Sequence, residues 1–291
     1  MSDLILSTLV SGLVLGSLYA LMASGLSLVW TTLGVFNFAH GALMMIGAYV
    51  AWTVCDPEGL GLGLIPGILA GTLAAAVIGA VIERTLVRPF YGHRAMLLVT
   101  VMTTLAAMII MEKAAQMIWG ARLKQLPRLV EGEVSLLGVT ISAHEAAIIV
   151  IAPVLLLGLW AFAQRLPSGR ALRAAGQNAD SAWLIGIDVP RAFMTAFALS
   201  AGLAGLTGAL LGAIRFVTPT MGSEPLLKAM IVIIFGGLGS LGATAGAAYA
   251  IGILEAFLVL AVGLYWAPSI LFLIIILGLV IRPQGLFGAK A

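Results

Sequence analysis

The chain has 291 residues, of which 62% are hydrophobic and only 9% are charged, whereas about a quarter of the residues of a soluble domain are charged. This composition and the mean hydropathy of +1.14 exclude an ordinary soluble protein. The net charge of +3 comes from Lys and Arg residues spread over several loops, a pattern that does not indicate nucleic-acid binding. The single cysteine, Cys55, excludes a disulfide framework, and we expect no metal or other cofactor in this chain.

Apolar windows long enough to cross a bilayer follow one another along the whole chain. They cover residues 4–30, 35–54, 63–83, 95–119, 143–163, 193–214, 226–244, 246–264 and 266–281. The window 226–244 has four glycines in its second half, and each glycine weakens a helix by about 1 kcal/mol relative to alanine. We predict an all-α integral membrane protein, a polytopic bundle of eight or nine transmembrane helices with one helix broken or re-entrant, in a single domain over residues 1–291.

Positive charges gather in the segments 84–94 and 164–191 and in the C-terminal tail with Arg282 and Lys290. Nine crossings would place these three segments on one side of the membrane. The positive-inside rule predicts that this side is the cytoplasm of a bacterial inner membrane, with the N-terminus outside and the C-terminus inside. Lys228 is assigned to the outer side, where the segment 120–142 is predicted to form an extracellular loop with a short hairpin.

The longest polar interruption, residues 164–192, is predicted to contain two short helices. Ser168 can cap the first, over 169–175, and Gly176 can end it. Asn178 or Asp180 can cap the second, and Gly186 can end it. The loop is therefore expected to protrude from the membrane.

The second short helix is predicted to carry a small apolar patch. Its members are Ala182, Trp183, Ile185 and Ile187. Such a patch on a polar loop indicates a protein partner. The alternative is an amphipathic turn on the lipid surface, with the arginines near anionic headgroups and Trp183 at the interface.

A few polar side chains lie inside the apolar windows. Asn37 and His40 are three positions apart, and so on one face of a helix; they can form structural hydrogen bonds between helices or line a path. Thr103 can bond to its own helix backbone instead. Glu255 is more informative, because an ionisable residue in a span is functional or paired, unless it is protonated or reaches water at a helix end.

Four blocks resemble the permease subunits of branched-chain amino-acid type ABC importers and occur in the order of that family. They are FNFAHGALMMIGAY (Phe36 to Tyr49), GRALRAAGQNADSAWLIGIDVPR (from Gly169), KAMIVIIFGGLGSLGATAG (from Lys228) and IRPQGLFG (from Ile281). The resemblance covers essentially the whole chain. It implies a non-catalytic subunit that forms half of a translocation path for branched-chain amino acids or related small solutes.

The resemblance also implies partners and site residues. The partners are a second similar permease subunit, two cytoplasmic ATPase subunits and an extracytoplasmic solute-binding protein. The chain has no phosphate-binding motif GxxxxGK[ST], so ATP and Mg would be bound by the ATPase subunits. A coupling helix in the loop 164–192 would contact them through Arg170, Arg173, Ala174, Asn178, Asp180, Ala182, Trp183, Gly186 and Ile187. Independently of the resemblance, the polar residues inside the apolar windows, Asn37, His40, Thr103 and Glu255, are the candidates for lining the path.

A second function remains open from the sequence. The chain could be an ion-coupled secondary transporter or channel that uses Glu255 as a proton or ion site. That alternative predicts transport without ATP, whereas the importer requires an ATPase encoded elsewhere.

Overall fold

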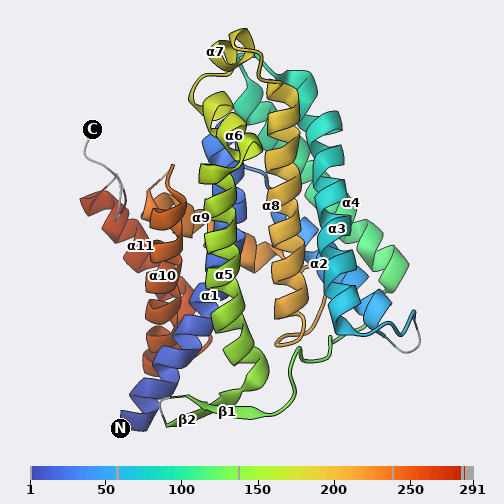
Figure 1. Ribbon diagram of the computed structural model, residues 1–291. Helices are drawn as coiled ribbons and strands as arrows, with labels where there is room; N and C mark the ends of the chain where they lie inside the picture. The colour runs from blue at the N-terminus through green and yellow to red at the C-terminus, as the bar shows by residue number, and fades with distance from the viewer. Residues whose placement is uncertain (1, 57–58, 137, 238, 283–284, 286–291) are drawn as a thin grey trace. The chain divides into compact units, whose positions relative to one another are not determined.

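The computed structural model describes residues 2–56, 59–136, 138–237, 239–282 and 285, and it is mostly helical (Figure 1). Most of the block 281–288, together with Lys290, lies outside the described residues. The chain divides into two compact units. The first comprises residues 1–27, 130–157 and 228–291, and the second comprises 28–129 and 158–227. The single domain expected from the sequence stays a prediction.

The first unit holds most of α1 (Ser2–Leu33) and of α5 (Ala143–Arg165), together with α10 (Leu241–Val262) and α11 (Ala267–Ile281). The predicted hairpin is present as the antiparallel strands β1 (Glu133–Leu136) and β2 (Val139–Ser142). Helices α1 and α10 approach through small residues, since a Cβ built on Gly16 would lie 2.8 Å from the Cα of Tyr249. Close backbone approach of this kind gives helices in a membrane dispersion contacts that lipid cannot replace.

The second unit is built around three helices: α2 (His40–Cys55), α3 (Leu64–Ile82) and α8 (Val189–Leu211). Gly47 of α2 lies directly against Gly205 of α8, and a Cβ on either Gly47 or Gly71 would overlap the backbone of the facing helix. Helix α4 (Met96–Trp119) packs against α2. The rest of this unit includes α6 (Pro167–Gln177) and α7 (Ala179–Leu184), and the π-turn Glu83–Val87 with the 3₁₀ turn Arg88–Phe90 after α3.

A helix lies in each of the nine predicted windows, but their lengths differ. Six helical segments of the described chain are long and apolar enough to span a membrane. Helices α2, α9 (Ser223–Gly236) and α11 are shorter, so the number of eight or nine spans stays a prediction. The window 226–244 is not one continuous helix, because α9 ends at Gly236 and Ser240 caps α10 through the N–H of Ala243 at 3.3 Å.

The second unit has two distinct ends. At one end, Arg88 donates to the carbonyl of Pro190 at 3.2 Å, and Gly176 lies against the backbone of Thr31. At the other end, Lys124 and Val217 form a β-bridge. Two of the three cationic segments, 84–94 and 164–191, therefore meet at the same end of this unit. The side of the membrane on which this end lies stays a prediction.

Candidate functional site

The loop helix α6 begins and ends differently from the prediction. Leu166 is the N-cap residue and Pro167 occupies the first turn, where its missing N–H costs nothing; Ser168 therefore lies inside the helix and the predicted Ser168 cap is wrong. Gly176 does not stop the helix either, because α6 continues to Gln177. Gly176 instead allows close approach, since a Cβ there would overlap the carbonyl of Thr31.

Helix α7 confirms the predicted local chemistry. The Asn178 side chain accepts a hydrogen bond from the Ser181 N–H at 2.9 Å, so Asn178 is the cap and Asp180 lies in the first turn. Gly186 follows the helix with φ +85°, a left-handed conformation that favours glycine. Asp188 then caps α8 by accepting from the Arg191 N–H at 3.0 Å. The turn between α7 and α8 is thus fixed at both ends.

The exposed apolar surface of α7 differs from the predicted patch, because it includes Leu184 and lacks Ala182 and the half-buried Ile187. Ala182 is buried, whereas Leu184 is 79% exposed beside Trp183 at 69% and Ile185 at 74%. Figure 1 shows α7 at the tip of the connection from α6 to α8. We call Trp183, Leu184 and Ile185 the α7 tip. Of the other predicted coupling residues, Arg170 and Arg173 are exposed, and Ala174 and Ile187 are half-buried.

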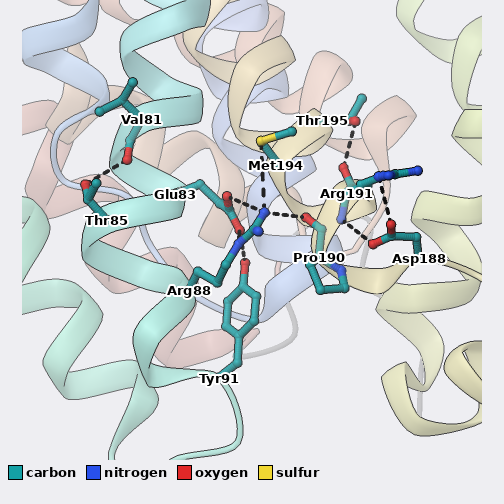
Figure 2. Close-up of polar contacts among 10 residues, drawn as sticks. All are labelled: Val81, Glu83, Thr85, Arg88, Tyr91, Asp188, Pro190, Arg191, Met194 and Thr195. Atoms are coloured by element: carbon teal, nitrogen blue, oxygen red, sulfur yellow. Dashed lines mark hydrogen bonds and ion pairs between the residues drawn. The ribbon is translucent and has the colours of Figure 1, made fainter.

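A cluster of charged and phenolic groups joins the end of α3 to the first turn of α8 (Figure 2). Glu83 is fully buried, and its two oxygens accept from Arg88 Nε and Nη2, each at 3.2 Å. The Tyr91 hydroxyl donates to the same carboxylate at 2.5 Å. Burial, followed by this hydrogen bond, raises the pKa of Tyr91 above its ordinary value. Residues Glu83, Arg88 and Tyr91 are called the Glu83 cluster below. Arg88 lies in the segment 84–94, which the sequence indicated only as a cationic loop.

The predicted path residues near α2 lie in the second unit. Asn37 and His40 are fully buried, but α2 begins at His40, so the two residues do not share a helical face as predicted. His40 Nδ1 lies 3.2 Å from Ser200 Oγ of α8. Asn37 accepts from the Ala39 N–H at 3.1 Å, and its Nδ2 has no hydrogen-bond partner among the described residues. Thr103 donates to the Leu86 carbonyl at 3.2 Å.

Glu255 belongs to a buried ionic cluster in the first unit. Lys228 Nζ lies 2.5 Å from Glu255 Oε1 and 3.0 Å from the Tyr19 hydroxyl. The Tyr19 hydroxyl in turn donates to Glu255 Oε2 at 2.8 Å. Lys228 is only 3% exposed, so it lies inside the unit; its assignment to the outer side of the membrane stays a prediction. Tyr19, Lys228 and Glu255 are called the Glu255 cluster below.

These features describe a helical membrane protein with a projecting, locally rigid loop, and comparison with known proteins identifies its family. The family model for the permease component of the branched-chain amino acid transport system matches residues 8–281. The chain therefore belongs to the branched-chain amino-acid permease family of ABC importers.

Several curated relatives match nearly the full length of the chain. The high-affinity branched-chain amino acid transport system permease protein BraD of Pseudomonas aeruginosa is 32% identical, over 97% of this chain and 95% of the relative. Permease protein LivH of the corresponding Escherichia coli system is 28% identical over the same shares. The fructose import permease protein FrcC of Rhizobium meliloti is 30% identical over only 32% of this chain and 26% of its own length. No solved structure matches the chain.

Proposed function

We propose that this chain is the transmembrane permease subunit of a binding-protein-dependent ABC importer. It would form half of the translocation path for branched-chain amino acids or related small solutes, opposite a second similar permease subunit. Full-length similarity to permeases named for branched-chain amino acid transport supports this solute class. The subunit would lie in a bacterial cytoplasmic membrane with its N-terminus outside and its C-terminus inside, and an extracytoplasmic binding protein would deliver the solute.

The observation that carries the proposal is the α7 tip. Three large apolar side chains, each more than two thirds exposed, project from a polar loop. Exposing such a group to water is unfavourable unless a partner or lipid covers it. The Asn178 cap and the Gly186 turn hold this short helix in one conformation, which lowers the entropy lost when a rigid partner binds. A groove on an ATPase subunit is the partner that the family membership favours.

Two ATPase subunits would bind ATP and Mg and supply the energy, because this sequence has no phosphate-binding motif of its own. Closure of these subunits would displace α7, and the turn Ile185–Asp188 would pass the displacement to α8. Arg170 and Arg173 are exposed on the preceding helix α6 and would contact acidic groups of the partner. Selectivity can reside in the binding protein, so the path need bind the solute only weakly.

Substitution of Trp183 by alanine tests this assignment. Large central aromatic residues often dominate binding, and we expect Trp183→Ala to weaken co-purification of the ATPase subunits by about tenfold or more. The matched control is Trp160→Ala, which removes another exposed tryptophan, on α5. Equal ATPase binding by both variants would contradict the proposal. A photoreactive group at Leu184 should form adducts with the ATPase subunit; adducts with lipid alone would favour the membrane-surface alternative.

The ion-coupled alternative is less favoured by the contacts of Glu255. Its carboxylate already bonds to Lys228 and Tyr19, so its charge is balanced without a transported ion. ATP-independent uptake by this chain alone, with strong loss in Glu255→Gln, would support the alternative.

A further inference from the structure

We propose that the Glu83 cluster is a latch that couples α7 to α3, so that Glu83 and Arg88 are positioning residues for ATP-driven transport. The inference rests on the proposed function, because it concerns how movement of α7 reaches the membrane helices. Neither residue needs to contact the solute or an ATPase subunit in this role.

The latch lies where a displacement of α7 would enter the helical bundle. The Arg88 guanidinium bonds to Glu83 and also donates to the carbonyl of Pro190, at 3.2 Å (Figure 2). Pro190 is in the first turn of α8, only six residues after the end of α7 at Leu184. The Tyr91 ring meets the ring of Phe193 edge-on, with 5.2 Å between centroids. Two separate contacts therefore join the α3 end to the start of α8.

The chemistry of the latch resists stretching. Both oxygens of the buried Glu83 carboxylate are held by the planar fork of one arginine, which fixes direction as well as distance. Separation of the two groups would leave a fully buried carboxylate without its cation, which is strongly unfavourable. The end of α3 therefore holds Arg88 in place, and the hydrogen bond from Arg88 to the Pro190 carbonyl links this fixed group to the first turn of α8.

The backbone after α3 departs from a regular α-helix at the residues that form the latch. Residues Glu83–Val87 form a π-turn, a wider turn that is frequently found at functional sites. The Arg88 N–H bonds to the Glu83 carbonyl across this turn, and the side-chain pair spans the same two residues. The close backbone contacts of α3 with α8 lie earlier in α3, at Gly79 with the Phe197 carbonyl and at Gly71 with Gly205. The latch thus ties the first turn of α8 to α3 beyond those contacts.

The test uses the complete importer in liposomes: this chain, its partner permease, the ATPase subunits and the binding protein. Solute uptake and ATP hydrolysis are measured together for Glu83→Gln and Arg88→Lys. We expect Glu83→Gln to lower the uptake per ATP hydrolysed by about tenfold, a factor typical of the coupling between two distant sites in a protein. Arg88→Lys keeps the charge but loses the fork, and should give a smaller fall. Co-purification of the ATPase subunits should be unchanged, because α7 is untouched.

The matched control is Arg84→Lys, since Arg84 is an exposed arginine on the same turn; it should retain the wild-type ratio. An unchanged ratio in both latch variants would overturn the proposal. So would a proportional loss of uptake and hydrolysis, because that pattern indicates a purely structural role. If Glu83→Gln does not assemble, Arg88→Lys decides by the same ratio. Failure of wild-type importer to take up solute with ATP would instead refute the proposed function.

Discussion

The two buried clusters contain the same three kinds of group: one glutamate, one cation and one tyrosine. The Glu83 cluster draws all three from nine consecutive residues, at an end of the second unit. The Glu255 cluster draws its members from α1, α9 and α10 within the first unit. Their exposure differs as well, because the Arg88 side chain is 28% exposed whereas that of Lys228 is 3% exposed.

This difference in the exposure of the cation suggests different roles for the two clusters, although they contain the same kinds of group. The Arg88 guanidinium reaches water and keeps part of its solvation when the loop moves, so the Glu83 cluster can move as one piece with its ion pair intact. Lys228 and Glu255 have little water to replace a lost partner, and separation of a buried pair is strongly unfavourable. We therefore interpret the Glu255 cluster as a fixed joint that holds the interrupted region of α9 and α10 to α1.

The largest expected effect is at the fixed joint. Lys228→Met leaves the Glu255 carboxylate buried without its cation, and should lower the free energy of unfolding by about 3–5 kcal/mol. The double variant Lys228→Met with Glu255→Leu should recover most of this loss, because an apolar pair of similar volume replaces both charges. Denaturant unfolding in detergent measures both. The control is Lys113→Met at an exposed lysine of α4; an equal loss there would contradict the fixed joint.

An intermediate effect on the free energy of unfolding is expected at the close backbone contact between α2 and α8 in the second unit. A Cβ on Gly47 would overlap the Cα and carbonyl of Gly205, and Gly47→Ala should cost about 1–3 kcal/mol through overpacking. The control Gly158→Ala places a methyl group on α5 with no other atom within 4 Å, and should stabilise by up to about 1 kcal/mol. Thermal unfolding compares them. A neutral Gly47→Ala would show that α2 and α8 separate easily.

The positions of most helices could be predicted because a membrane helix needs a long apolar run. The start and end of α7 could be predicted because Asn178 and Gly186 act within a few residues of their own positions. The start of α6 was predicted wrongly because Ser168 was expected to cap the helix. Pro167 instead occupies the first turn, a position that suits proline, so the helix begins earlier. The ends of a short helix can be predicted from the sequence when the residue that caps it acts within a few positions and no neighbouring residue fits better.

The contacts within the two clusters could not be predicted from the sequence, for different reasons. Lys228 and Glu255 lie on separate helices, and no pattern in the sequence reports which helices touch. Glu83 and Arg88 are five residues apart, whereas neighbours on an α-helix are three or four apart; only the π-turn brings them together. A buried Glu83 could have been suspected from its position at the end of an apolar window, next to several arginines.

The smallest expected effect is a pH dependence at the Glu83 cluster. The pKa of Tyr91 is raised by burial and by its hydrogen bond to Glu83, so the folded chain holds this proton more tightly than the unfolded chain. Its contribution to stability is full below the unfolded pKa of about 10 and is lost as pH rises toward the raised folded value. The unfolding midpoint of wild-type should therefore fall more steeply above about pH 10 than that of Tyr91→Phe. Tyr265→Phe, at an exposed tyrosine, should keep the wild-type slope; identical slopes in wild-type and Tyr91→Phe would show that the phenol is not held by the latch.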